Sequence, residues 1–351
     1  MLFVFRADAS PRIGFGHVMR CLTLAQALTE NGHTCHFISR QLPDVLQQRL
    51  ISAGISVHAL DYALAAEKEA PFTVAEHADA AQTQQVLDSL AGSKVLIVDH
   101  YGLGLDWERT LRADVERIMV IDDLASRHHD CDILLDQNLG RTEADYRPLV
   151  PDSCQILAGT RFTLLRKEFA QKRAALVETD VPTEARSVLI NLGGGDSLPL
   201  LTQCLHSLVN HFQHLSLNLT LVTGQPINEK ALLNAVKLPS SWSIRLLSNI
   251  DTMADILAAT DIAIGAAGSS AWERCCLGVP SILFVLADNQ QVIANALAEE
   301  GAALVVTNPD ASFTQAFQSL LDPEVRTTLR ANSSRLCDGL GVERVVAKLL
   351  P

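Results

Sequence analysis

Short apolar strands alternate with helical segments along nearly the whole chain, and this alternation restricts the fold more than any other feature. Such a repeat predicts parallel sheets covered by helices, an α/β fold. In the first half we expect strands at 2–6, 34–39, 56–59, 94–99, 118–122 and 133–136, with helices at 17–31, 44–53, 74–90 and 105–112. In the second half we expect strands at 187–191, 217–223, 243–247, 262–266, 281–285 and 303–306, with helices at 199–211, 252–259, 270–277 and 290–299.

The length of 351 residues suits two domains that each bury a core. We expect one doubly wound domain at 1–170 and another at 186–330. The segment 171–185 is charged, contains Pro182 and has no strand pattern, which is typical of a linker. The helical segment 331–351 is expected to pack back on the first domain. Ligands of such sheets sit beyond the carboxyl ends of the strands, so we expect a site in a cleft between the domains.

The composition excludes several classes of function. A formal net charge of −12 argues against broad contact with nucleic acid or an anionic membrane, so neither is an expected partner. The eight cysteines contain no CxxC pair, which predicts reduced thiols in a cytoplasmic protein. The amino-terminal residues do not have the pattern of a signal peptide, and no apolar run approaches the about 20 residues that span a bilayer.

The first motif with chemical potential joins the first strand to the first helix. Gly14 and Gly16 allow close approach of the backbone to an anionic group, and His17 follows at the predicted helix start. The positive end of a helix disfavours a protonated imidazole, so His17 is a candidate general base toward water. The alternative is a histidine that only packs or caps the helix. The spacing of the glycines does not fit the dinucleotide-binding fingerprint.

A second motif ends the buried strand at 94–99. Asp99 is placed to orient His17 or a water molecule, and Tyr101 to hold a hydroxyl or amide of a sugar. The alternative is that Asp99 caps a turn and Tyr101 belongs to the core. A third group, from Asp122 to Asn138, contains several acids and histidines, including the Asp-x-Asp pattern of Asp130 and Asp132. Its spacing is generic, so we expect structural loops and no metal site, with Asp122 a further candidate near the sugar.

Two further motifs lie in the second half. Gly194 belongs to the triple glycine that follows a strand, a pattern typical of a phosphate or sugar loop but also of a tight turn. After the strand at 262–266, the backbone amides from Gly268 to Ser270 are placed to hold a diphosphate. Glu273 is placed to accept hydrogen bonds from ribose hydroxyls, although Ser270-x-x-Glu273 also fits a helix capping box. Asn289 follows the next strand and is expected at the same edge.

The chain resembles the UDP-2,4-diacetamido-2,4,6-trideoxy-β-L-altropyranose hydrolases of pseudaminic acid biosynthesis. The segments that carry the resemblance run in order from Arg6 to Ile282: RADASPRIGFGHVMRCLTLA, VDHYGLGLDWE, IDDLASRHHDCDILLDQN, NLGGGD and IGAAGSSAWERCCLGVPSI. The first is highly specific. The segment Gly265–Glu273 is shared more broadly with glycosyltransferases of the GT-B fold, so the resemblance implies two Rossmann-like domains that face a central cleft.

The resemblance also implies roles for individual residues. His17 would activate or orient the attacking water, and Tyr101 and Asn289 would lie on the sugar side as further catalytic residues. The second domain would hold UDP through a set of substrate-binding residues that comprises Asn249 and Ile250 at the uracil, Gly265, Ala267, Gly268, Ser269 and Ser270 at the diphosphate, and Glu273 at the ribose. Family members are regarded as metal-independent and inverting, so no metal or cofactor is expected.

The resulting hypothesis is a monomeric hydrolase that binds a UDP-sugar and releases UDP. One alternative is a GT-B glycosyltransferase that moves the same kind of sugar to an acceptor. The first half has no cluster of Lys and Arg with interleaved aromatic residues for a lipid acceptor, which favours hydrolysis. A second alternative is a UDP-sugar sensor without catalysis, against which the candidate base His17 argues.

Overall fold

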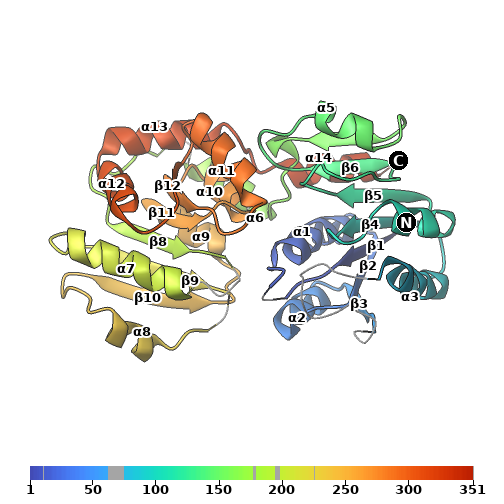
Figure 1. Ribbon diagram of the computed structural model, residues 1–351, viewed down its shortest axis with the longest axis horizontal. Coiled ribbons are helices and arrows are strands. Elements are labelled where there is room, and N and C mark those ends of the chain that lie inside the picture. Colours follow the sequence, from blue (N-terminus) through green and yellow to red (C-terminus); the bar gives the residue numbers. More distant parts are fainter. Residues whose placement is uncertain (11, 62–74, 177–178, 194–197, 225, 351) are drawn as a thin grey trace. The chain divides into compact units, whose positions relative to one another are not determined.

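The computed structural model describes residues 1–10, 12–61, 75–176, 179–193, 198–224 and 226–350 (Figure 1). Its strands are β1 (Leu2–Ala7), β2 (Thr34–Ser39), β3 (Ser56–Ala59), β4 (Lys94–Asp99), β5 (Arg117–Ile121), β6 (Ile133–Asp136), β7 (Gln155–Ala158), β8 (Ser187–Asn191), β9 (Asn218–Thr223), β10 (Ser243–Ser248), β11 (Ile262–Ala266), β12 (Ser281–Phe284) and β13 (Leu304–Val306).

The helices complete the alternation with the strands. They are α1 (Gly16–Glu30), α2 (Asp44–Ser52), α3 (Glu76–Ser89), α4 (Leu105–Leu111), α5 (Glu143–Tyr146), α6 (Lys167–Leu176), α7 (Leu198–Phe212), α8 (Glu229–Ala235), α9 (Met253–Ala258), α10 (Ser270–Cys276), α11 (Gln290–Glu299), α12 (Ala311–Ser319), α13 (Pro323–Ser334) and α14 (Gly341–Leu349). Short 3-10 helices lie at η2 (Arg112–Asp114), η3 (Arg147–Leu149) and η4 (Thr160–Phe162).

The chain divides into two compact units. The first comprises Met1–Leu164 and Leu340–Pro351, and the second Leu165–Gly339. The limits predicted from the sequence are 1–170, 171–185, 186–330 and 331–351. The start of the expected linker is helical, because α6 extends to Leu176 and buries Phe169. The facing of the two units across a cleft stays a prediction.

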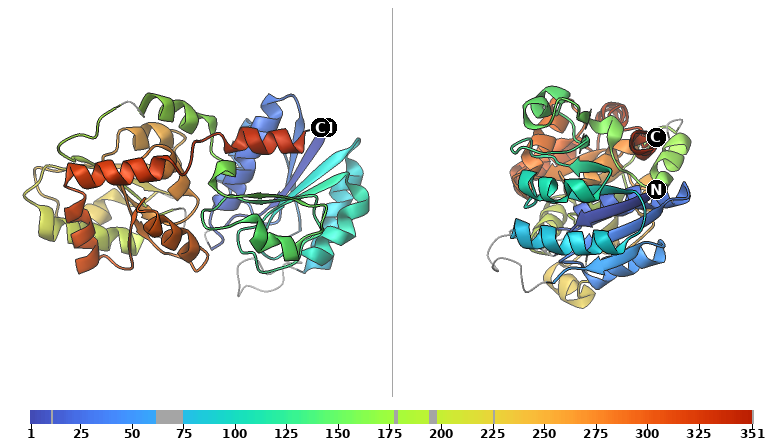
Figure 2. Two further views of the ribbon diagram at one scale, coloured as in Figure 1. Left: turned by 90° about the horizontal axis from the view of Figure 1, so that it is seen from above. Right: turned by 90° about the vertical axis from the view of Figure 1, so that its right-hand side faces the viewer.

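The first unit contains a parallel seven-stranded sheet in the order β3-β2-β1-β4-β5-β6-β7. The sequence analysis missed its edge strand β7, in which only Leu157 is buried. Helices cover both faces of the sheet (Figure 2). Alternation along β1 explains this arrangement, because Phe3 and Phe5 join one core with α1, α2 and α14, whereas Val4 joins the opposite core with α3 and α4.

The carboxyl-terminal helix α14 packs on α1 in this first unit, while α13 belongs to the second. Val345 and Leu349 are fully buried in the core with α1. The helix begins against the backbone of Thr163, where a Cβ atom added to Gly341 would lie 2.2 Å from the carbonyl oxygen. Only glycine therefore fits this contact without displacement of the backbone.

The second unit contains a parallel six-stranded sheet in the order β10-β9-β8-β11-β12-β13. Both sheets thus have the doubly wound order in which the chain first moves outward on one side and then crosses to the other. The core of this unit joins the strands to α7, α12 and α13 through buried aliphatic and aromatic side chains such as Leu205, Phe284 and Phe317. No described helix combines the length and the apolar character that crossing a bilayer requires.

Buried charges hold the loops around β5 and β6. His129 Nδ1 lies 2.6 Å from Glu108 Oε1, and His129 Nε2 lies 3.8 Å from Asp122 Oδ1. Burial acts to lower the pKa of His129, but these two carboxylates outweigh it and raise the pKa to about 9. Asp122 also accepts hydrogen bonds from the backbone amides of Leu124 and Ala125, so its carboxylate is engaged in the loop.

The Asp-x-Asp pattern is likewise engaged by protein groups. Arg112 Nη1 lies 2.5 Å from Asp132 Oδ2, and Arg112 Nη2 lies 3.7 Å from Asp130 Oδ1. The described residues contain no group of three or more His, Cys, Asp or Glu side chains arranged to hold a metal ion. Three acids of the third sequence motif, Asp122, Asp130 and Asp132, are thus paired with Arg112 or His129.

We predict that Gly341→Ala destabilises the protein by at least about 2 kcal/mol, because the added methyl group collides with the backbone of Thr163. The sign is informative, since Gly→Ala in an unconstrained helix is normally stabilising by about 1 kcal/mol. Urea unfolding measures the change. Lys348→Ala, on the exposed side of the same helix, is the control, and a Gly341→Ala variant as stable as the wild type contradicts the packing of α14.

A second prediction concerns pH. The pKa of about 9 lies above the ordinary value of His129, so protonation stabilises the fold fully below pH ~6.5, and this contribution is lost as the pH rises through 9. The difference in unfolding free energy between the wild type and His129→Asn is expected to shrink by on the order of 3 kcal/mol from pH 6 to pH 10. His128→Asn replaces the exposed neighbour as the control. If the difference in unfolding free energy between the wild type and His129→Asn does not change with pH, His129 is not stabilised as a cation by Glu108 and Asp122.

Candidate functional site

The first candidate site lies at the point where the winding of the first sheet changes direction. The chain leaves β1 toward one edge of the sheet and leaves β4 toward the other, and the two strands are neighbours with Ala7 opposite Asp99. A crevice at the carboxyl ends of two such strands is the usual ligand site of a doubly wound sheet. The loop after β1 leads to His17, and β4 ends directly before His100 and Tyr101.

His17 is held by the carboxylate of Asp99. Both side chains are buried, and His17 Nδ1 lies 2.6 Å from Asp99 Oδ1. A carboxylate only accepts hydrogen bonds, so Nδ1 carries the proton and donates it to this contact. In the neutral ring Nε2 then carries the lone pair, as in the histidine of a catalytic triad. This arrangement is suited to removing a proton from water.

Arg20 holds Asp99 from the other side. It lies one turn after His17 on α1, and it donates from Nε to Asp99 Oδ2 and from Nη2 to Asp99 Oδ1, each at 2.6 Å. Burial acts to raise the pKa of Asp99, but the charges and hydrogen bonds of Arg20 and His17 outweigh it and hold the pKa below its ordinary value. Asp99 is therefore a fixed anion. The sequence analysis missed Arg20, although the spacing His17-x-x-Arg20 places both on one helix face.

The same arginine reaches the side of Tyr101. Arg20 Nη1 donates to Asp123 Oδ2 at 3.2 Å, and the hydroxyl of Tyr101 donates to Asp123 Oδ1 at 2.6 Å. The ring centroids of His17 and Tyr101 are 4.8 Å apart, with the planes at 88°. His17 and Tyr101 therefore lie side by side, each oriented by a carboxylate that Arg20 binds. The sequence analysis considered Asp122 here, but its neighbour Asp123 makes these contacts.

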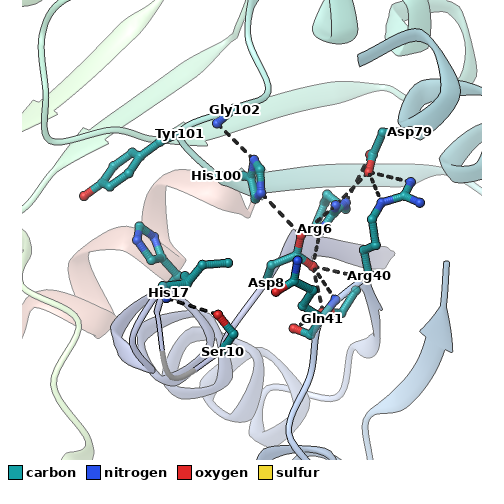
Figure 3. Close-up of polar contacts among 12 residues, drawn as sticks. Arg6, Asp8, Ser10, His17, Arg40, Gln41, Asp79, His100, Tyr101 and Gly102 are labelled. Carbon is teal, nitrogen blue, oxygen red and sulfur yellow. Dashed lines mark hydrogen bonds and ion pairs between the residues drawn. The ribbon is translucent and has the colours of Figure 1, made fainter. Parts of the chain in front are cut away.

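A buried cluster lies beneath this site (Figure 3). Asp8 accepts hydrogen bonds from Arg6 Nη1 at 2.7 Å and from the backbone amide of Arg40 at 2.7 Å. His100 Nε2 lies 3.3 Å from the other oxygen of Asp8, while His100 Nδ1 accepts from the amide of Gly102 at 3.1 Å. The cluster thus joins the ends of β1, β2 and β4, which fixes the loops that carry His17 and Tyr101.

The glycines before α1 form a tight turn. Gly14 has a φ of +86°, which favours glycine, and its amide donates to the carbonyl oxygen of Ser10 at 2.8 Å. This amide is therefore used inside the loop, and an anion contact at Gly14 is not supported by the geometry. Gly16 is the first residue of α1 and directly precedes His17.

The second candidate site lies at the corresponding point of the second sheet. The neighbouring strands β8 and β11 end at Asn191 and Ala266, and Asn191 is opposite Gly265. Gly193 follows β8 with a φ of +95°. Gly194 lies outside the described residues. The loop after β11 leads through Gly268 and Ser269 to Ser270, the first residue of α10.

The residues of this loop differ in their surroundings. Ala267 is buried and its amide donates to Phe284 O at 2.9 Å, so this amide belongs to the sheet. Gly268 adjoins the first turn of α11, because a Cβ atom added to it would lie 3.4 Å from Gln290 Nε2. Asn289 directly precedes α11 and is exposed. The loop after β11 and the start of α11, which follows β12, thus lie side by side at Gly268 and Gln290. The sequence analysis did not single out Gln290.

Glu273 is not part of a capping box. Helix α10 begins after Ser269, which makes no side-chain capping hydrogen bond, and Ser270 Oγ accepts instead from Arg274 Nη1 at 3.2 Å. The capping-box alternative is therefore wrong. The side chain of Glu273 is 21% exposed. Burial raises its pKa above the ordinary value, and the charges of Arg166 and Arg274 offset part of this rise.

Arg166 connects Glu273 with the loop after β10. Its Nη2 lies 3.9 Å from Glu273 Oε1, and its Nη1 donates to the carbonyl oxygen of Asp251 at 3.0 Å. This loop carries Asn249, whose φ of +52° is unusual for a residue other than glycine, and Ile250. Arg166 thus lies between Glu273 and Asp251, the residue that follows Asn249 and Ile250. It is not among the residues predicted from the sequence, because nothing local marks its partners.

The comparisons with known proteins concern both units. Residues 188–335 match the family described as glycosyltransferase family 28 C-terminal domain. The UDP-2,4-diacetamido-2,4,6-trideoxy-beta-L-altropyranose hydrolase of Campylobacter jejuni is 32% identical over 175 residues, which cover 49% of this chain and 54% of that protein. The chain spans about half the length of the curated relatives it matches, between 54% and 60% for three of them.

Solved structures share the fold at low sequence identity. MurG of Acinetobacter baumannii has a TM-score of 0.61 at 16% identity and covers 99% of this chain and 98% of its own. The UDP-GlcNAc 2-epimerase of Neisseria meningitidis, solved with UDP-GlcNAc, has a TM-score of 0.63 at 13% identity with the same coverage. The predicted fold class is thereby confirmed: the chain has the two-domain α/β architecture of the GT-B fold, and its residues 188–335 match the glycosyltransferase family 28 C-terminal domain.

Proposed function

We propose that this chain is a hydrolase that cleaves UDP-2,4-diacetamido-2,4,6-trideoxy-β-L-altropyranose to UDP and the free diacetamido sugar, a step of pseudaminic acid biosynthesis. The observation that carries the proposal is the contact of His17 Nδ1 with Asp99 at the carboxyl ends of β1 and β4. The similarity to the Campylobacter jejuni hydrolase supports the substrate. The proposed enzyme is a cytoplasmic monomer, and no step requires a metal or cofactor.

In the proposed reaction His17 Nε2 accepts a proton from water while the water oxygen attacks the anomeric carbon. The bond from this carbon to the UDP oxygen breaks, and UDP leaves with the electron pair, which inverts the configuration. Asp99 stabilises the imidazolium that forms, and Arg20 keeps Asp99 ionised. General base catalysis of this kind contributes on the order of 10²–10⁴ in rate. Tyr101 and Asn289 bind the sugar.

The nucleotide is proposed to bind at the second unit. Amides of Gly268, Ser269 and Ser270 hold the diphosphate, Glu273 accepts from the ribose hydroxyls, and the loop at Asn249 and Ile250 contacts the uracil. Preorganised donors of this kind are typically worth about 3 kcal/mol each to developing charge. The proposal requires the sugar of a nucleotide bound in this way to reach His17 of the first unit.

The family 28 match favours a second candidate function, a GT-B glycosyltransferase that moves a UDP-activated amino sugar to an acceptor. Both functions need the same nucleotide site. They differ in the nucleophile, which is water in the hydrolase and an acceptor hydroxyl in the transferase.

The test of the proposed function is NMR of the purified chain with the diacetamido UDP-sugar and no acceptor. We expect the wild type to release UDP and the inverted free sugar, and His17→Ala to lose about 10²–10⁴-fold in kcat while keeping its affinity for UDP. The physical reason is that only the base is removed, whereas the proposed nucleotide contacts lie in the other unit.

Gln26→Ala is the matched control, because Gln26 lies on the same helix and is half-exposed. Full turnover by His17→Ala removes His17 from the mechanism. Release of UDP only after an acceptor is added favours the transferase.

Glu273 gives a separate prediction for the nucleotide site. Glu273→Ala is expected to weaken UDP binding by on the order of tenfold, because two hydroxyl donors of the ribose lose a charged acceptor, while the melting temperature changes little. Isothermal titration and thermal melting measure the two effects. Glu299→Ala, an exposed acid at the end of α11, is the control. If only the melting temperature falls, Glu273 has a structural role.

A further inference from the structure

Arg274 is a buried cation whose hydrogen bonds to described residues go only to neutral groups. Its exposed fraction is 3%, and no carboxylate of the described residues forms an ion pair with it. Its Nη2 donates to the carbonyl oxygen of Ala266 at 2.5 Å and its Nη1 to Ser270 Oγ at 3.2 Å, while Nε has no hydrogen-bond partner in the described part of the chain. The guanidinium thus donates to a carbonyl oxygen and a hydroxyl oxygen, whereas a buried guanidinium normally donates to a carboxylate.

The charge of Arg274 persists at neutral pH. Burial lowers its pKa to about 10, with Cys275 and Glu273 offsetting part of the effect, so the guanidinium stays protonated. Burial of an incompletely compensated charge is costly, and proteins keep such groups where a ligand completes the pairing. We therefore expect an anionic ligand to bind near Arg274.

The position of this charge is set by Gly265. A Cβ atom added to Gly265 would lie 2.6 Å from Arg274 Nη1, 2.9 Å from its Cζ and 3.0 Å from the carbonyl oxygen of Asn191. The absence of a side chain at Gly265 thus admits the guanidinium between the ends of β8 and β11. This is the point of the second sheet where a doubly wound fold binds ligands. It also gives Gly265 a role that needs no direct ligand contact.

Ser270 transmits the effect of this charge toward a ligand. Its Oγ accepts the hydrogen bond from Arg274, so the hydroxyl hydrogen is directed to another partner and is available to an anionic oxygen. A hydroxyl that accepts from a cation is a stronger donor, because hydrogen bonds in a chain polarise one another.

We propose that Arg274, from beneath the loop 266–270, supplies the positive charge that selects a nucleoside diphosphate over the uncharged nucleoside. The inference rests on the proposed binding of UDP at this loop and adds the group that balances its charge. Arg274 is a positioning residue: it touches Ala266 and Ser270, acts on the diphosphate through Ser270 and through its field, and leaves the uracil and ribose contacts to other residues.

The test compares UDP with uridine by isothermal titration of the full chain. For Arg274→Met, which is similar in length and uncharged, we expect UDP affinity to fall about tenfold to hundredfold while uridine affinity changes less than about twofold. Arg274→Lys keeps the charge and is expected to recover most of the preference for UDP. A purely structural role would change the affinities for both ligands in parallel.

A second variant tests the same proposal with Arg274 in place. Gly265→Ala fills the space of the guanidinium and is expected to lower the ratio of UDP to uridine affinity in the same direction. Arg335→Met removes an exposed charge of the same unit and is the control, with an unchanged ratio. Circular dichroism and thermal melting check that each variant is folded, and Gly265→Ala and Arg274→Lys decide the question if Arg274→Met unfolds.

The outcomes separate this proposal from the proposed function. An unchanged ratio in folded Arg274→Met, or parallel loss of both ligands, overturns the role of Arg274 while the wild type still binds UDP. A wild type that binds neither ligand overturns both proposals.

Discussion

The paired contact of Arg20 with Asp99 is the interaction on which the candidate catalytic site depends. Asp99 ends a strand that is buried from Val95 onward, where an unpaired carboxylate would take up a proton or destabilise the fold. Arg20 supplies two hydrogen bonds at 2.6 Å, so the carboxylate stays charged and fixes His17 in one tautomer. Because Arg20 also binds Asp123, the same side chain determines where Tyr101 lies relative to the imidazole.

Each unit has a buried arginine near the point where the winding of its sheet changes direction. In the first, the buried Arg20 is paired with two carboxylates of the protein itself. In the second, the guanidinium of Arg274 donates its hydrogen bonds to a carbonyl and a hydroxyl. This difference supports assigning proton transfer to the first unit and anion binding to the second, a division of labour that matches the proposed hydrolysis of a nucleotide-sugar.

Much of the fold could be predicted from the sequence, because the strands β2, β3, β4, β6, β8 and β11 have the expected limits and their apolar runs are bounded by turns. The edge strand β7 and helix α6 were missed because each buries a single side chain. In the site, His17, Asp99 and Tyr101 could be placed at one sheet edge from the motif order. Two partners of predicted residues could not be found in this way. Asp123 binds Tyr101 from 22 residues away, and Arg166 lies near Glu273 from 107 residues away, distances that a local pattern does not contain.

In the capping-box alternative for Glu273, a local pattern is present in the sequence but the contact that it predicts does not form. The pattern Ser-x-x-Glu is correct for a capped helix, but Arg274 takes the serine hydroxyl and the helix begins one residue earlier than that box requires. The hydrogen bond from Arg274 engages the hydroxyl of Ser270, and the spacing of Ser270 and Glu273 alone does not reveal this contact.

The most direct measurement of the central claim is a crystal structure of the chain with UDP and the free diacetamido sugar bound together. The account predicts that the anomeric hydroxyl oxygen, which derives from the attacking water, lies about 2.6–3.2 Å from His17 Nε2 while Nδ1 remains on Asp99. A complex in which the sugar binds away from His17, or in which the imidazole has turned from Asp99 to face solvent, would contradict it.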